Sequence, residues 1–360
     1  MKPRRAEIEL IYEGKNISRD ISPYLVSLSF TDNTGKADDL QIVLEDREGK
    51  WSNPWLPKAG DKITAKIILY SWYRPGSVHS VPCGTFEVDS INISAPPESV
   101  TVRASSLPSN SRLKNERNTK AWEKVTLSQI AKRIGAAAKL KVLFETDDVT
   151  YDRIDQTNQT DIAFLVDIAD KEGVSVKVTN DAIVLFDDLK YESMVPVRKI
   201  ERGQSDILSY AFDLNTVDAA YAACTVSYLT TVKPAKKNAK DKPTERKRRP
   251  TKKRTKPAKL MIKGSYRIPG KIGPELKLNE RVASVAEAIK KAKKALRQKN
   301  KEVERGSLTL MGDYVLVQGV TVNLSGFGGF NGKYFIETAT HTVSGSGYDV
   351  RLELRKVLGY

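Results

Sequence analysis

The sequence contains few of the residues on which catalytic and metal sites are usually built. Its 360 residues include two cysteines, Cys83 and Cys224, and two histidines, His79 and His341. Two distant cysteines cannot form a disulfide framework or a four-cysteine zinc site, so we interpret both as small buried hydrophobic residues. Neither histidine lies in a local nucleophile motif. We therefore expect no enzymatic activity, no cofactor and no metal site.

Long hydrophobic runs are absent as well. No window approaches the roughly 18 consecutive apolar residues of a membrane-spanning helix. The first residues, MKPRRAEIELIYEG, place no apolar segment after their basic residues and so do not resemble a secretory signal. We expect a protein that is made in the cytosol and has no membrane anchor.

Positive charge is concentrated in one segment, residues 233–259. This segment contains fourteen Lys and Arg against one Asp and one Glu, and it contributes +12 of the formal net charge of +16. It has four prolines and no aromatic residue, a composition that predicts a disordered loop. The candidate contact residues for an acidic partner or nucleic acid are Arg246, Lys247, Arg248, Arg249, Lys252, Lys253 and Arg254.

Three interpretations of this segment stay open. Its cations could neutralise nucleic-acid phosphates, although it lacks the aromatic residues that single-strand binders add to charge. They could contact an acidic surface of a protein partner. The segment could also be a solvated insertion with no partner.

Residues 1–110 alternate apolar and polar side chains in short runs bounded by turn residues. Six strands are predicted, at EIELIY, VSLSF, LQIVLED, ITAKIILY, TFEVDSINI and SVTVRAS. Six short strands in about a hundred residues are typical of a small β-barrel or sandwich.

Residues 111–199 predict a small α/β domain. Thr126 and Gln129 fit a capping box that opens a helix ending near Lys139. Thr160 is a second N-cap, and Gly173 is a C-terminal stop for the helix that it opens. The runs VSVKV and AIVLF that follow predict a hairpin.

Alternation returns in residues 200–232 and again in residues 306–360. We expect these two segments to form one second β-barrel, because the first of them offers too few strands to close a core. Residues 233–305 would then be an insertion, with an amphipathic helix at about 283–304. The predicted fold is therefore mainly β, with two barrels, a middle α/β domain, and an inserted basic loop and helix.

Three segments together resemble a known family. They are residues 38–67, with DDLQIVLEDREGKW and PKAGDKITAKI; residues 156–188, in which a polar N-cap opens a helix ending in Glu-Gly; and residues 326–356, with a Gly-rich turn, Gly-Lys-Tyr, a His and an alternating strand. This order resembles the phage late control D group, the baseplate hub proteins of contractile tails. The group is related to the base of type VI secretion spike proteins and to hubs of phage-tail-like bacteriocins.

The resemblance implies a structural protein of a virion or tail-like particle. Three copies, each with two tube-protein-like barrels, would form a ring that adapts the hexameric tail tube to the trimeric central spike. The implied partners are the tail tube protein, a central spike protein and other baseplate or tape-measure components, with a route for nucleic acid through the ring. Because residue 360 is reached without a spike domain, we expect the spike to be a separate protein.

Two other functions stay open from the residues alone. The chain could be a nucleic-acid-binding protein that uses residues 233–259, which would show a steep dependence of binding on salt. It could also be a tail protein that binds or hydrolyses peptidoglycan through residues 111–199. The lack of a local catalytic motif makes hydrolysis the weaker alternative.

Overall fold

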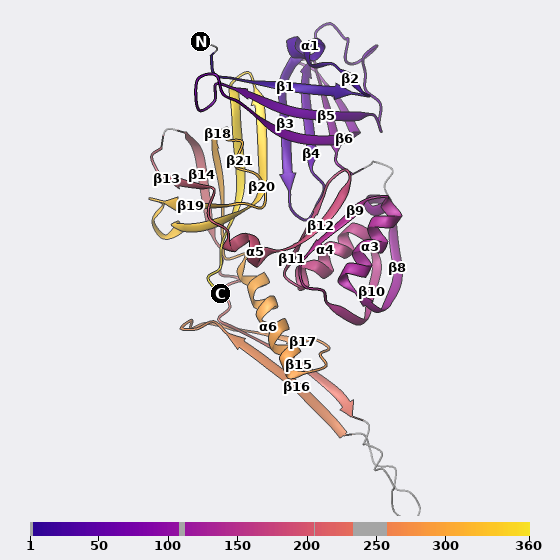
Figure 1. The fold of residues 1–360 in the computed structure, drawn as a ribbon, viewed down its shortest axis with the longest axis vertical. Helices are drawn as coiled ribbons and strands as arrows, with labels where there is room; N and C mark the ends of the chain where they lie inside the picture. The colour runs from indigo at the N-terminus through magenta and orange to yellow at the C-terminus, as the bar shows by residue number, and fades with distance from the viewer. Residues whose placement is uncertain (1–2, 108–111, 205, 233–257) are drawn as a thin grey trace, which may run out of the picture. The chain divides into compact units, whose positions relative to one another are not determined.

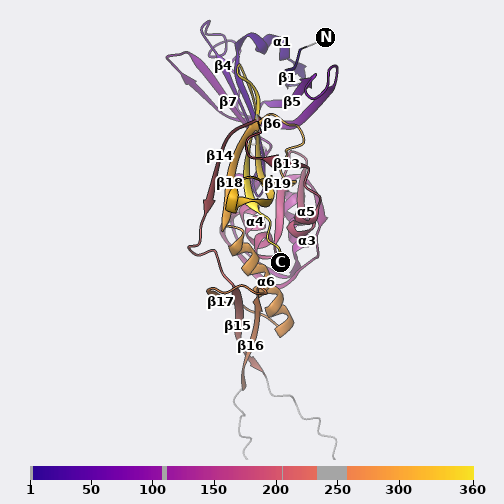
Figure 2. The ribbon, with the colours of Figure 1, turned by 90° about the vertical axis from the view of Figure 1, so that its left-hand side faces the viewer.

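The computed structural model describes residues 3–107, 112–204, 206–232 and 258–360. The chain divides into two compact units (Figures 1 and 2). The large unit is Met1–Thr216 with Lys301–Gly359, and the small unit is Val217–Asn300 with Tyr360. The disorder predicted for residues 233–259 lies outside the described residues, except that Ala258 and Lys259 begin a strand.

One mainly antiparallel sheet dominates the large unit. Its strands are β1 (Arg5–Tyr12), β2 (Lys15–Asn16), β3 (Leu25–Asn33), β4 (Asp39–Glu45), β5 (Lys62–Tyr70), β6 (Val78–Ser94), β7 (Ser99–Ser105), β13 (Arg198–Glu201), β14 (Ile207–Leu214), β18 (Glu304–Met311), β19 (Thr321–Ser325), β20 (Gly332–Ser344) and β21 (Gly347–Lys356). Their order is β14-β18-β21-β20-β3-β4-β7-β6-β5-β1-β2, with β19 on β20 and β13 on β19. The six strands predicted before residue 110 are confirmed as β1 and β3 to β7.

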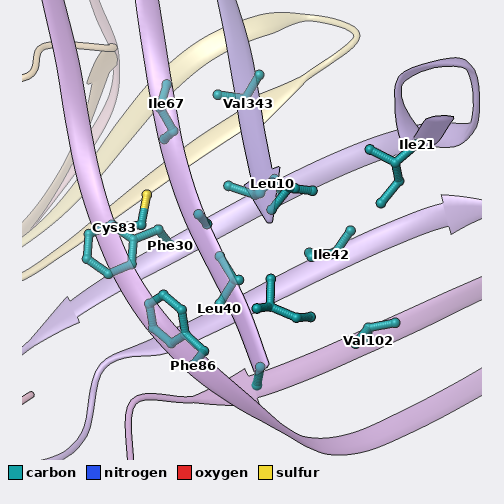
Figure 3. Packing of buried hydrophobic residues seen from close by; sticks show 14 of the residues in the cluster. Leu10, Ile21, Phe30, Leu40, Ile42, Ile67, Cys83, Phe86, Val102 and Val343 are labelled. Atoms are coloured by element: carbon teal, nitrogen blue, oxygen red, sulfur yellow. The ribbon is translucent and has the colours of Figure 1, made fainter. Parts of the chain in front are cut away.

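Strands β3, β4, β7, β6, β5 and β1 curl around a shared hydrophobic core. Alternate residues of each strand point inward, as Leu10, Phe30, Ile42, Ile67 and Phe86 do in Figure 3. Trp51 and the short helices α1 (Ser18–Ile21) and η1 (Ser22–Tyr24) lie between these strands in the sequence. The alternation that predicted the strands therefore also identified their buried side.

Strands β14, β18, β21, β20, β19 and β13 curl around a second core. Its buried residues include Ile200, Leu308, Tyr334, Ile336 and Leu352. The Gly-rich turn before β20 contains the short helix η2 (Gly328–Phe330), as expected for a turn between two strands. We name these six strands the second curled segment and the six around Leu10 the first curled segment.

The two curled segments are not separate sheets. The second half of β20 pairs with β3, so that Thr340 lies opposite Thr31 and His341 opposite Phe30. Among the described strands, the sheet stays open at β14, at β13 and at β1 and β2. The structure therefore shows one continuous curled sheet where two independent barrels were expected, because β20 is long enough to serve both segments.

The large unit also contains the predicted α/β elements. They are α2 (Arg112–Asn115), β8 (Arg117–Thr126), α3 (Leu127–Ala138), β9 (Lys141–Glu145), β10 (Thr150–Thr160), α4 (Asp161–Lys171), β11 (Val174–Val178), β12 (Ala182–Asp187) and α5 (Asp188–Ser193). Thr126 and Gln129 form the predicted capping box, and Thr160 caps α4. The hairpin of β11 and β12 is confirmed, and β9 extends it in parallel.

The small unit is a three-stranded sheet covered by one helix. Its elements are β15 (Ala223–Val232), β16 (Ala258–Arg267), β17 (Glu275–Asn279) and α6 (Val285–Asn300). The predicted amphipathic helix is confirmed, and its residues Ala288, Ala292 and Leu296 are buried. Gly264 of β16 allows this packing, since a Cβ there would stand 2.7 Å from that of Ala288.

The position of β15 corrects the expectation for residues 200–232. We expected β15 to join the second barrel, but it pairs with β16 and β17 in a separate sheet. Its apolar residues Cys224 and Val226 are covered by α6, together with Ile262 and Leu276 from the neighbouring strands. The alternation in β15 was recognised correctly, whereas its partners were wrong because β16 and β17 had not been predicted.

Candidate assembly interface

Strand β14 is an edge strand that exposes apolar side chains. Among the described strands it pairs only with β18, so the backbone groups on its outer edge have no strand partner. Leu208 is 60% exposed and Leu214 is 61% exposed, and Tyr210 is also exposed. The register shifts at Leu208, which is left without an opposite residue. Such an edge is prone to pair with another chain unless a partner covers it.

Phe212 holds β14 against the rest of the second curled segment. Its ring lies 5.2 Å from the ring of Phe330 in a stacked arrangement and 5.3 Å from that of Phe327. On its other side, Phe212 lies over Gly306, the residue opposite it on β18. The packing of Phe212 therefore holds β14 on the sheet, while the apolar side chains of Leu208 and Leu214 stay exposed.

The opposite end of the sheet, at β1, is charged. Glu9 of β1 pairs with Lys66 at 2.6 Å, and Arg5 pairs with Glu7 at 2.7 Å. The short strand β2 covers only Ile11 and Tyr12 of β1. Charged side chains on an edge strand discourage pairing with the wrong chain. The open edges at β14 and at β1 therefore differ in chemistry.

A buried ion cluster fixes α5 to β21. The Arg355 guanidinium donates to Glu192 at 2.6 Å and to Asp188 at 3.2 Å, and it pairs with Glu337 at 3.1 Å. Lys301 also donates to Asp188. Burial alone would raise the pKa of Asp188, but Lys301 and Arg355 outweigh it and hold that pKa below its usual value. Glu337 is available because a bulge in β20 leaves it without a partner on β21.

The segment that follows α5 is apolar and exposed. Met194, Val195 and Val197 are 47%, 86% and 45% exposed. The Val197 amide donates to the Thr321 carbonyl at 2.8 Å, which sets the start of β13 beside β19. This segment and β14 supply most of the exposed apolar side chains of the second curled segment, and we take them together as the candidate assembly interface.

The two histidines lie in aromatic surroundings. The His79 ring stacks on that of Tyr314 at 4.5 Å. His341 is fully buried between Phe30 and Tyr348, and its Nδ1 lies 2.8 Å from the Tyr348 hydroxyl. Burial lowers the pKa of His341 to about 4, so its ring is neutral at physiological pH. The alternating pattern of β20 did not show on which face His341 lies, and the structure places this side chain in the first core.

Both cysteines are buried, as predicted. Cys83 belongs to the first core and Cys224 to the core of the small unit. Burial raises the pKa of the Cys83 thiol to about 12 and that of the Cys224 thiol to about 11. Thiols held in this protonated state are poor nucleophiles and metal ligands.

A hollow of about 260 Å³ lies beside Trp122 in the α/β elements. Sugar binding there would need an open aromatic face, but Trp122 is 5% exposed. The Lys120 ammonium lies 4.2 Å from the centre of the Trp122 ring, which also stacks with that of Phe164 at 6.1 Å. This geometry gives no support to peptidoglycan binding at this hollow.

The seven basic candidate residues from Arg246 to Arg254 lie outside the described residues, so the structure does not place them. Within the described part of the chain, no cluster of His, Cys, Asp and Glu is arranged to hold a metal ion. No helix in the same part is both long enough and apolar enough to cross a membrane. The interactions described above are hydrophobic packing, strand pairing and ion pairing.

Comparisons with known proteins agree on one family. The profile of the phage tail baseplate hub (GPD) family matches residues 87–347. The chain is 28% identical to the probable baseplate hub protein of Escherichia phage 186, over 96% of this chain and 91% of the relative. Its fold is similar to that of a 43 kDa tail protein of the Shewanella oneidensis prophage MuSo2, with a TM-score of 0.66, 16% identity and 98% of each chain covered.

The fold is also similar to a component of the Escherichia coli type VI secretion system that itself resembles bacteriophage T4 tail proteins. The TM-score is 0.50 with 11% identity, and the match covers 93% of this chain and 74% of the other. At such low sequence identities, the similarity to these solved structures shows a shared fold only.

Proposed function

This chain belongs to the phage tail baseplate hub family, and from that premise we propose that three copies form a ring that adapts the hexameric tail tube to the trimeric central spike. The family is structural and non-enzymatic, and its members are components of the tail baseplate of a virion or tail-like particle. The function is therefore assembly and load bearing. We expect the chain to be made and assembled in the bacterial cytoplasm.

The main support for this proposal is that the sheet curls twice. Each chain contributes two six-stranded segments with separate cores, so three chains would present six such segments to a hexameric tube. In this proposal the segments act as tube-like barrels, formed by residues 1–110 and by residues 200–216 with 306–360. Residues 111–199 would be carried between them as the middle α/β domain.

The candidate assembly interface would join neighbouring copies. Covering the apolar edge of β14 and the segment from Met194 to Val197 removes exposed hydrophobic surface from water, which favours association. Pairing of the β14 backbone with another copy would also satisfy its open hydrogen-bonding groups. Permanent interfaces of this kind commonly bury more than about 2,000 Å² in total.

The proposed partners are the tail tube protein on one side of the ring and a spike protein on the other. The similarity to a type VI secretion component that resembles phage tail proteins supports a spike partner. Other baseplate or tape-measure components would contact the same ring.

The direct test is the mass of the purified chain. We expect native mass spectrometry to find a trimer, and electron microscopy of the isolated particle to show a three-fold ring with six barrel densities. A monomer at every concentration, together with a ring of any other symmetry in the assembled particle, would refute the trimer.

The basic segment supports a second candidate role. Arg246, Lys247, Arg248 and the other cations of residues 233–259 could hold an acidic partner or nucleic acid by charge alone. Because Val232 and Ala258 are opposite each other at the end of the hairpin of β15 and β16, an Asn-Gly turn can replace residues 233–257. If particles carrying this turn assemble normally and resist salt as the parent does, the segment has no such role.

A further inference from the structure

The small unit carries the whole excess of positive charge in this protein. Its described residues, 217–232 and 258–300, contain twelve Lys and Arg against four Asp and Glu, a net charge of +8. Residues 233–257 add +11, so the unit as a whole has +19 and the rest of the chain has −3. The folded part of the unit is therefore basic in its own right, independently of the segment that interrupts it.

The two faces of the small sheet have opposite chemistry. Even-numbered residues of β15 and β16, such as Cys224, Val226 and Ile262, pack under α6. Odd-numbered residues lie on the other face because side chains alternate along a strand. That second face, which we name the open face, presents Lys263, Ser265 and Arg267 of β16 and Glu275, Lys277 and Asn279 of β17, all exposed.

The register arranges the open face in three rows across the sheet. Lys263, Ser227 and Asn279 form one row; Ser265, Thr225 and Lys277 form the next; Arg267, Ala223 and Glu275 form the third. The central strand contributes small side chains, of which Ala223 and Thr225 are buried and Ser227 is partly exposed, while long cationic ones stand on both outer strands. With a rise of about 3.4 Å per residue and about 4.8 Å between strands, the Cα atoms of Lys263 and Lys277 lie about 12 Å apart.

The donors on this face suit phosphate oxygens. Ammonium, guanidinium, amide and hydroxyl groups can all donate to phosphates, which only accept. One carboxylate interrupts the set: Glu275, in the third row, accepts a hydrogen bond from the Thr225 hydroxyl. The cationic part of the face is therefore centred on the rows of Lys263 and Lys277, and Glu275 marks its limit.

From this arrangement we propose that the open face of the small unit binds the backbone of duplex DNA. Duplex DNA carries one negative charge per about 1.7 Å of its axis, so a stretch about 12 Å long has roughly seven phosphate charges, some of which face any one side. None of the residues in the three rows is aromatic, which removes the base stacking that single-strand binders use. Beside the row of Lys263 the same face presents Leu229 and Met261, which are opposite each other and exposed, so the cationic rows lie between these apolar residues and Glu275.

The test compares two pairs of lysines with equal charge. Lys263→Gln with Lys277→Gln removes two cations from the open face, while Lys290→Gln with Lys293→Gln removes two exposed cations from α6. Both pairs are made in the full chain and in the chain in which Asn-Gly replaces residues 233–257, so that the thirteen cations of that segment do not mask the result. Binding of a short fluorescent DNA duplex is followed by anisotropy between about 50 and 200 mM salt.

We expect the chain with the Asn-Gly turn to retain DNA binding. The open-face pair should weaken it about tenfold and lower the slope of log affinity against log salt by about 2, whereas the α6 pair should change both much less. Glu275→Gln should tighten binding, because it removes a like charge from the face. This gain-of-function variant keeps the test decisive even if the double lysine variant folds poorly.

Three outcomes would overturn the proposal: no DNA binding once residues 233–257 are replaced, equal losses from the two lysine pairs, or no gain from Glu275→Gln. Competition with polyglutamate of the same charge tests the partner class. If polyglutamate displaces DNA as well as unlabelled DNA does, the face binds acidic protein instead. Ring assembly is measured separately, so failure of either proposal leaves the other standing.

Discussion

The ring of Phe212 lies over Gly306 on the neighbouring strand, where a Cβ would stand 2.6 Å from its Cε1 atom. Glycine at this position therefore allows the aromatic side chain to lie flat on β18. This contact fixes the edge strand β14 and with it the candidate assembly interface.

Substituting Ala for Gly306 should push Phe212 out of its place between Phe327 and Phe330. Overpacking of this kind costs about 1–3 kcal/mol of unfolding free energy. Thermal unfolding measures the loss. Gly345→Ala is the matched control, because a Cβ there would meet nothing within 4 Å. Equal melting temperatures for the two variants would show that Phe212 does not need the space over Gly306.

Arg355 should be the most sensitive charged residue in the large unit. It is 2% exposed and neutralises Glu192 and Asp188, so Arg355→Leu would remove a buried cation from beside two buried carboxylates. Loss of one partner from a buried pair costs about 3–5 kcal/mol. Arg351→Leu removes an arginine of the same strand whose pair with Glu353 is exposed, and about 1 kcal/mol or less is expected there. Chemical denaturation of both variants measures the difference.

A second substitution separates lost charge pairing from lost packing at this site. Adding Glu192→Gln to Arg355→Leu removes a buried negative charge that Arg355 neutralises in the parent and should restore part of the stability. If the double variant were as unstable as the sum of the two single variants, the loss would come from packing of the Arg355 side chain.

Local signals in the sequence predicted the local structure well. The capping residues Thr126 and Thr160 placed both long helices of the α/β elements within a residue or two. Alternation placed the six strands of the first curled segment. These features are encoded within a few residues of the chain, and so short windows of sequence reveal them.

The missed features depend on contacts between distant residues. Thr31 pairs with Thr340 across some three hundred residues, and nothing near either strand indicates that β3 and β20 join the two curled segments. Strands β16 and β17 had a readable pattern, since Ile262 and Tyr266 of β16 and Leu276 and Leu278 of β17 stand at even spacing among mostly polar residues. This stretch belongs to the predicted insertion of residues 233–305, for which no strand was predicted. The candidate assembly interface could not be predicted because exposure of an edge follows from sheet order.

Titration of His341 should make stability depend on pH. Its pKa falls from 6.5 to about 4 on folding, so between these values the unfolded chain binds a proton that the folded chain does not. The stability from this group is complete above pH 6.5 and is lost as pH falls towards 4, by up to about 3 kcal/mol.

His341→Asn isolates this contribution, since Asn does not titrate and its amide can still meet the Tyr348 hydroxyl. The parent should lose stability relative to this variant as pH falls from 7 to 4. A direct comparison is needed because burial raises the pKa of Asp38 to about 6, and protonation of Asp38 stabilises the fold over part of the same range. Parallel pH profiles of parent and variant would contradict a neutral buried histidine.

The apolar edge of β14 should control association. Leu208→Glu with Leu214→Glu places two charges where the trimer proposal buries apolar side chains, so the variant should be monomeric while keeping the melting temperature of a folded monomer. Size-exclusion chromatography with light scattering measures the mass. Ile272→Glu is the control, because Ile272 is 98% exposed in the small unit and lies outside the candidate assembly interface. Trimers of unchanged stability from the β14 variant would place the contact between copies elsewhere.

The small unit should depend on Gly264 for the contact between its sheet and its helix. A Cβ at this position would stand 2.7 Å from the backbone nitrogen of Ile289 as well as 2.7 Å from the Ala288 Cβ, and a helix backbone cannot move aside as a flexible side chain can. Gly264→Ala should therefore lift α6 from β16, at a cost of about 1–3 kcal/mol. Hydrogen exchange of the α6 amides should quicken while the amides of β20 and β21 keep their protection, because the two units are separately compact. Gly273→Ala is the control, since its nearest contact would be an ordinary 3.4 Å from the Ala222 Cβ. Equal exchange of α6 in these two variants would mean that the helix does not need the close approach at Gly264.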